Sequence, residues 1–144
     1  MKTIGTLILL LPTFFTAQKE TDIWYFGRNA GVEFSSGKPI TILDGKMNTN
    51  EGCTVICDDL GKLLFYSDGT SVWNRNHEIM SNGQGLKGNA SSTSSGVAIA
   101  KPGHSGIYYL FTVTQIAGDD GLCYSLIDMN SNGGLGNVVE SEKN

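Results

Sequence analysis

The chain is poor in the residues that build catalytic, metal and nucleic-acid sites. Its 144 residues include two histidines, three cysteines and three prolines, and ten lysines and arginines stand against fourteen aspartates and glutamates. Phosphate binding needs clustered basic side chains, whereas these are scattered singly, so we expect no nucleic-acid partner. The histidines and cysteines show no zinc-ligand spacing, and a zinc site is not expected.

Three cysteines are too few for a disulfide framework, and their odd number leaves at least one thiol free. Cys53 and Cys57 lie in one predicted strand, about 13 Å apart, so they cannot pair with each other. The spacing does not exclude a disulfide bond between Cys123 and either Cys53 or Cys57. The favoured interpretation is that the cysteines are small core residues.

Long apolar runs are confined to the start of the chain. Lys2 is followed by a mostly apolar run that ends at Phe15, well short of the roughly 20 residues that cross a bilayer. This pattern predicts a cleavable signal peptide over residues 1–17, processed after Ala17, and therefore an exported protein without a transmembrane segment. Residues 18–144 are long enough for one domain.

Helical periodicity is missing from the rest of the chain, where short apolar runs alternate with Gly-, Asn- and Asp-rich turns. The pattern predicts an all-β fold. The predicted strands are Ile23–Phe26, Val32–Phe34, Cys53–Cys57, Leu63–Tyr66, Ser71–Trp73, Gly96–Ala100, Ile107–Val113 and Leu122–Met129. The polar stretch from Gly83 to Ser95 separates two groups of hairpins.

Three predicted strands, Ile23–Phe26, Leu63–Tyr66 and Ile107–Phe111, are apolar on both faces, which predicts that each is covered from both sides. Stacked four-stranded antiparallel sheets do this in β-propellers. A weak repeat places Val55 and the strand after it 42 residues before Val97 and its following strand. We therefore expect an incomplete β-propeller of about three blades.

Several multi-residue motifs resemble one known family. They are Trp24–Phe34, Asn50–Cys53, Leu64–Asn74 and Asn132–Gly136. Together they are similar to the N-terminal region of large secreted proteins of gliding bacteria, which carry a gliding-motility-associated C-terminal (type B) sorting domain and use the type IX secretion system. The resemblance implies a propeller-like surface protein with no assigned reaction.

That family is far longer than this chain, so the resemblance implies that residues 18–144 are a fragment whose own C-terminal part is missing. Val138 and Val139 then begin a further strand, which we expect to expose unpaired backbone groups.

Three residues are candidates for ligand contact. Glu51 precedes a predicted inner strand, and a carboxylate there must face a channel or find hydrogen bonds. Trp24 and Trp73 could stack on sugars, although packing between sheets accounts for aromatic residues first.

Catalysis and metal binding find little support. His77 and His104, with Glu33 and Glu78, have no identifiable partners, so no enzymatic activity is expected. Aspartates next to glycines favour turn chemistry over calcium binding, and no cofactor is predicted, structural calcium being the only alternative. The acidic side chains that could supply oxygen ligands for calcium are Asp58, Asp59, Asp119, Asp120 and Asp128. The Asp68–Gly69 pair predicts a type I′ hairpin turn.

The function expected from the sequence is that of a non-catalytic interaction or scaffold module, secreted or held at the outer cell surface, with a protein or a glycan as partner. A glycan-binding adhesion module is the first alternative, and a propeller hydrolase is the second.

Overall fold

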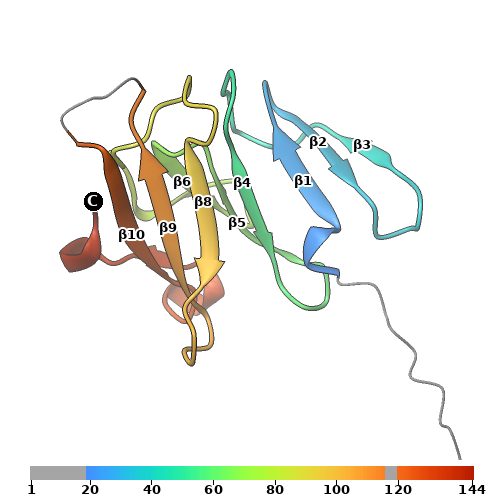
Figure 1. Cartoon of the computed structure of the whole chain (residues 1–144). Coiled ribbons are helices and arrows are strands. Elements are labelled where there is room, and N and C mark those ends of the chain that lie inside the picture. Colours follow the sequence, from blue (N-terminus) through green and yellow to red (C-terminus); the bar gives the residue numbers. More distant parts are fainter. Residues whose placement is uncertain (1–18, 116–119) are drawn as a thin grey trace, which may run out of the picture.

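The structure is a computed structural model, which describes residues 19–115 and 120–144. The predicted signal peptide lies outside the described residues. Eleven strands form two sheets among the described residues (Figure 1). They are β1 (Ile23–Phe26), β2 (Ala30–Glu33), β3 (Ile40–Ile42), β4 (Thr54–Cys57), β5 (Leu63–Ser67), β6 (Ser71–Asn74), β7 (Ile79–Gln84), β8 (Gly96–Ala100), β9 (Ile107–Val113), β10 (Leu122–Asp128) and β11 (Asn137–Val138). Three short 3-10 helices are η1 (Lys19–Thr21), η2 (Asn132–Gly134) and η3 (Glu140–Glu142).

The all-β prediction is confirmed, but the propeller prediction is wrong. The large sheet has eight strands in the order β4-β5-β6-β7-β11-β10-β9-β8, and a small sheet has the order β1-β2-β3. Separate four-stranded blades are not formed, because β11 pairs with both hairpin groups. Asn137 pairs with Ser81 of β7 in parallel and with Asp128 of β10 in antiparallel orientation. The final strand is therefore paired on both sides, and the expectation that it exposes unpaired backbone groups is wrong as well.

The large sheet curls into a nearly closed, barrel-like shape. In Figure 1, β10, β9 and β8 lie in front of β6 and β5, and β4 lies beside β8. The segment before β8 binds the segment before β4, since the Gly52 N–H donates to the Ser92 carbonyl (3.1 Å) and the Ser95 hydroxyl to the Gly52 carbonyl (2.6 Å). These bonds bring the two edge strands together.

Two hydrophobic clusters explain which strands are covered. Phe65, Leu110 and Ile127 belong to the cluster inside the curled sheet. Tyr25 and Tyr66 belong to a second cluster, between the outer face of β4–β6 and the small sheet. Because Phe65 and Tyr66 are neighbours on opposite faces of β5, this strand is covered from both sides, as its sequence predicts.

The same prediction is wrong for β9 and β1. In β9, Leu110 is buried, whereas Tyr109 and Phe111 on the other face are partly exposed. In β1, Tyr25 is buried but its neighbours Trp24 and Phe26 are exposed. One flank of each of these strands therefore faces solvent.

The turn after β5 has the chemistry predicted for it, but a different geometry. Gly69 has a positive φ of 86°, and Asp68 does not, so the turn is not of type I′. The Asp68 carboxylate accepts the N–H groups of Thr70 (2.9 Å) and Ser71 (2.8 Å). Asp58 and Asp128 likewise accept N–H groups of their own turns, which confirms turn chemistry at these positions. Asp119 lies outside the described residues.

Candidate functional site

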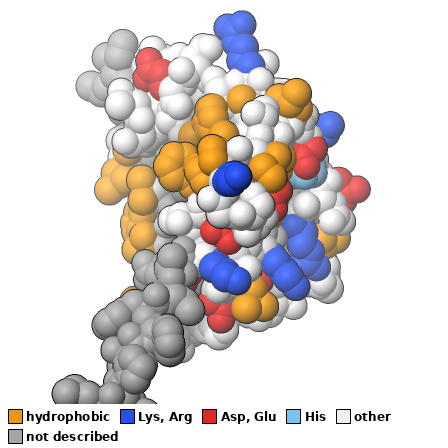
Figure 2. All heavy atoms as spheres, turned by 90° about the vertical axis from the view of Figure 1, so that its right-hand side faces the viewer, with side chains coloured by type: hydrophobic (Ala, Val, Ile, Leu, Met, Phe, Trp, Pro, Cys, Tyr) orange, Lys and Arg blue, Asp and Glu red, His pale blue; other side chains and the backbone are white. Residues whose placement is uncertain are grey.

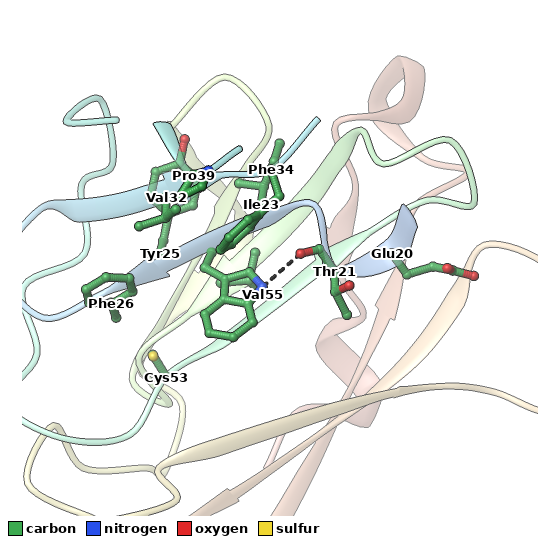
Figure 3. Close-up of a pocket in the computed structure, with 11 residues that line it drawn as sticks. Glu20, Thr21, Ile23, Tyr25, Phe26, Val32, Phe34, Pro39, Cys53 and Val55 are labelled. Carbon is green, nitrogen blue, oxygen red and sulfur yellow. Dashed lines mark hydrogen bonds between the residues drawn. The ribbon is translucent and has the colours of Figure 1, made fainter. Parts of the chain in front are cut away.

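An apolar groove of about 850 Å³ lies where the edge strand β1 faces the edge strand β4. The small sheet contributes Trp24, Phe26, Val32 and Phe34 to its lining, and Cys53 and Val55 come from β4 and the residue before it (Figure 3). Figure 2, which views the molecule from the side of the small sheet, shows hydrophobic side chains gathered on this end of the surface.

Trp24 is the most prominent side chain of the groove, and 52% of its surface is exposed. Its indole N–H donates to the Thr21 carbonyl at 2.8 Å, and its ring meets that of Phe34 edge-on, with centroids 5.6 Å apart. The hydrogen bond from the indole nitrogen thus fixes the side chain, and the exposed carbon atoms of the ring are accessible to a ligand.

Charge is scarce in the groove. Glu20 is the one ionisable carboxylate of the lining, and Figure 3 shows its side chain directed away from the aromatic residues. Burial raises the pKa of the Cys53 thiol, so this group is neutral near pH 7. Such a lining suits apolar side chains and offers few hydrogen-bonding partners.

Trp73 lies elsewhere. Its ring stacks on that of Tyr66, with centroids 5.3 Å apart and an angle of 11°, and it packs against the second hydrophobic cluster. The packing interpretation of this residue is therefore correct. The structure does not bring Trp24 and Trp73 into one site.

Glu51 lies in a second, polar hollow of about 470 Å³. Hydroxyl side chains line it, and the Thr93 hydroxyl is 3.5 Å from a Glu51 carboxylate oxygen. Ser92 Oγ is buried here and has no hydrogen-bond partner among the described residues. The aromatic and the polar candidates thus occupy two different hollows.

A polar network next to the second cluster was not predicted. Asp44 accepts the Tyr25 hydroxyl (2.8 Å) and lies 3.4 Å from His77 Nε2, while His77 Nδ1 lies 3.2 Å from the Tyr66 hydroxyl. Burial raises the pKa of Tyr25, with Asp44 adding to the effect, and burial also raises the pKa of Tyr66. The Tyr66 ring of this network is fully buried, whereas the His77 and Asp44 side chains keep 19% and 58% of their surface exposed, so only the Asp44–His77 side of the network meets solvent. The paired residues of this network lie 11, 19 and 33 positions apart in the chain, so no local sequence motif indicates them.

The remaining titratable candidates do not converge. His104 Nδ1 is 3.0 Å from the Pro102 carbonyl in an exposed turn, and Glu33 accepts the Ser35 hydroxyl at 2.6 Å. Over residues 19–115 and 120–144, no group of three His, Cys, Asp or Glu residues could hold a metal ion. Within the same ranges, no helix is long and apolar enough to span a bilayer.

The three cysteines carry free thiols. Cys57 is buried in the second cluster, and Cys53 packs against that cluster, so both serve as core residues. Burial raises the pKa of Cys57 to about 11, which leaves it unreactive near pH 7.

Comparison of the chain with protein-family models, with curated proteins and with solved structures finds no match.

Proposed function

We propose that this protein is an exported, non-catalytic interaction module that binds an extended, apolar segment of a partner protein in the groove between β1 and β4. The observation that carries the proposal is the exposed aromatic lining, with Trp24 and Phe26 beside Val32 and Val55. Large apolar side chains that remain exposed together mark interaction sites rather than ordinary surface.

The position of the groove between two edge strands favours an extended polypeptide as ligand. Both strands that flank it are the terminal strands of their sheets. Extended peptides commonly bind along sheet edges, where pockets receive their alternate side chains. The groove has alternating apolar residues from β1 to receive such side chains, since Trp24 and Phe26 lie on one face of the strand.

Export and surface location remain proposals. The apolar run between Lys2 and Phe15 supports export, and the resemblance of the motifs Trp24–Phe34 and Leu64–Asn74 to gliding-motility-associated surface proteins supports a place outside the cell.

The glycan-binding alternative has one observation in its favour, which is the exposure of Trp24. Sugar sites combine an aromatic face with polar side chains that bond the hydroxyls. Here the aromatic face lies in one hollow, and Glu51 with its neighbouring hydroxyls lies in the other. The apolar peptide is therefore the preferred ligand.

The test is a fluorescence titration of the protein with a soluble synthetic peptide of alternating phenylalanine and threonine residues, and separately with chitohexaose. We expect the peptide to shift Trp24 emission to the blue and the sugar to leave it unchanged. Val32→Asp, which places a charge in the groove, should weaken peptide binding at least about tenfold. Val97→Asp, a similar change on β8 at a residue that does not line the groove, is the matched control and should not weaken it.

The titration is repeated with protein that begins at Gln18. Binding of the peptide to this form only would mean that residues 1–17 occupy the groove in the longer form, and it would still support an apolar peptide as ligand. Binding of chitohexaose with no response to the peptide would overturn the proposal.

A further inference from the structure

The outer face of β8, β9 and β10 is a second apolar surface, separate from the groove. Cross-strand pairing defines its rows. One row runs Val97–Phe111–Tyr124, the next runs Ile99–Tyr109–Leu126, and Val113 pairs with Leu122 beyond them. Val97 is 50% exposed and Tyr124 44%, and the rings of Tyr109, Phe111 and Tyr124 form one cluster with centroids about 6 Å apart. A contiguous aromatic face of this kind is unusual on a monomer.

The other hairpin group shows how such a face is covered. Val55 pairs with Tyr66, and Tyr66 with Trp73, so β4–β6 carry the same sequence of one aliphatic and two aromatic residues as Val97–Phe111–Tyr124. On β4–β6 this row is covered by the small sheet, whose Tyr25 contacts Tyr66. On β8–β10 the described chain places only the short helix η3 against β10, where the Glu142 carboxylate accepts the Tyr124 hydroxyl at 3.3 Å, and no second sheet covers the row.

Charges of opposite sign close one end of the uncovered face. Lys101 follows β8, its N–H donates to the Ile107 carbonyl, and its ammonium lies 5.4 Å from the centre of the Tyr109 ring. Asp128 pairs with the same Ile107 from the other side. The row Lys101–Ile107–Asp128 thus has a cation at the β8 side and an anion at the β10 side.

This arrangement is complementary to itself. When two such faces are stacked about a two-fold axis parallel to the strands, β8 of one copy lies over β10 of the other. Lys101 then faces the Asp128 position of the second copy, and Val97 faces Tyr124, while Phe111 meets its own equivalent near the axis. Two sheets packed face to face lie about 10 Å apart, a distance that these side chains bridge.

We propose that the outer face of β8–β10 binds a second copy of this chain in a face-to-face dimer whose two-fold axis runs along the strands. The face measures about 10 Å across the strands and about 20 Å along them. This is well below the roughly 800 Å² per partner of a standard stable interface, so the dimer is weak and transient.

Sedimentation equilibrium of the full chain under reducing conditions tests the dimer. We expect the apparent mass to rise from that of one chain toward that of two over about 1 to 500 µM. Phe111→Asp, at the centre of the face, should abolish the rise. Leu43→Asp is the matched control, because Leu43 is a 75% exposed apolar residue away from this face, and it should not alter the association.

The charge pair tests the direction of the axis. Lys101→Asp should weaken association at least about fivefold by setting like charges against each other, and Lys101→Asp combined with Asp128→Lys should restore it. Because Asp128 also accepts bonds from Asn130 and Ser131, circular dichroism must show that the double variant is folded. If it is not, intermolecular NOEs between Val97 methyls and the Tyr124 ring, in a mixture of differently labelled copies, decide the same question.

A monomer at every concentration, or a dimer that Phe111→Asp leaves intact, would overturn the proposal. So would a folded double variant that fails to restore association, or the lack of Val97–Tyr124 NOEs in a dimer. Because this face is separate from the groove, failure here leaves the peptide-binding proposal standing.

Discussion

The rings of Tyr25 and Tyr66 lie 4.9 Å apart at an angle of 31°, and this contact joins β1 of the small sheet to β5 of the large one. Each hydroxyl is also bonded, since Tyr25 donates to Asp44 and Tyr66 accepts the Lys46 N–H at 3.0 Å. The small sheet is thus fastened to the large one by packing and by hydrogen bonds at the same point. This attachment also places Trp24 and Phe26 at the rim of the groove.

Removal of one hydroxyl from this attachment should destabilise the protein. Tyr66→Phe leaves the Lys46 N–H and His77 without their partner, and we expect the free energy of unfolding to fall by about 1–3 kcal/mol. Urea denaturation followed by circular dichroism measures the change. Tyr109→Phe is the control, because Tyr109 lies on the partly exposed outer face, and an equal loss in both variants would contradict this account of the network.

Alkaline pH should destabilise the protein through its buried acids. In the folded state Cys57 has a pKa of about 11, above its ordinary value of 9.0, and the pKa values of Tyr25 and Tyr66 are raised as well. Below about pH 9 the folded and the unfolded states both hold these protons, and the groups make their full contribution to the free energy of unfolding. Between pH 9 and 11 the unfolded chain loses the Cys57 proton while the folded protein retains it, so this contribution decreases. Stability should therefore fall as the pH rises, by up to about 1.4 kcal/mol per pH unit for each such group.

The measurement is the free energy of unfolding in urea across this pH interval. Cys57→Ala should lower stability at neutral pH by creating a small cavity, but it should make the alkaline slope shallower. Cys123→Ala, in a partly exposed cysteine of β10, should leave the slope as it is. A Cys57→Ala slope identical to that of the unsubstituted protein would rule out this thiol as a source.

Substitution of Gly69 tests how much the close contact between the two hairpin groups contributes to stability. A Cβ at this position would overlap the Ser95 carbonyl, and the backbone has a positive φ of 86°. Gly37 has a similar φ of 77°, but a Cβ there would meet nothing within 4 Å. Gly37→Ala should therefore cost about 1 kcal/mol for the strained backbone alone, and Gly69→Ala at least about 2 kcal/mol more. Equal thermal melting temperatures for the two variants would show that the contact with Ser95 is unimportant.

The two tryptophans should differ in fluorescence. Trp73→Phe leaves Trp24, whose exposed ring should emit at longer wavelength and be quenched readily by acrylamide. Trp24→Phe leaves Trp73, which stacks on Tyr66 and should be quenched several-fold less. Matching quenching constants would contradict the different environments of the two residues.

Much of the strand pattern is predictable from the sequence, because short apolar runs between turn residues are a local signal. β1, β8 and β9 have the predicted bounds, Ile23–Phe26, Gly96–Ala100 and Ile107–Val113. β3 (Ile40–Ile42) and β7 (Ile79–Gln84) were missed, since the first is short and the second is largely polar. Val55 pairs with Tyr66 as Val97 pairs with Phe111, but the sequence repeat alone does not specify this register.

The arrangement of the strands was not predictable in the same way. Apolar residues on both faces of Ile107–Phe111 indicate that both faces of this strand are covered, but they do not show whether the covering element belongs to the same chain. The propeller prediction failed because it depended on this step, and because the two residues of β11 joined what should have been separate blades. The groove is equally a product of tertiary structure, since it unites Trp24 with Val55 across two sheets, and only Trp24 was a candidate beforehand.

The position of β11 has a consequence for how the protein comes to its native state. Residues 137–138 follow every other strand in the chain, yet they lie between β7 and β10 and connect the two halves of the large sheet. During synthesis, the edges of β7 and β10 that pair with β11 stay unpaired until residues 137–138 have been synthesised. Completion of the sheet is thus a late folding step that depends on long-range contacts. Conditions that delay this step leave two half-sheets with unpaired strand edges, which favours aggregation.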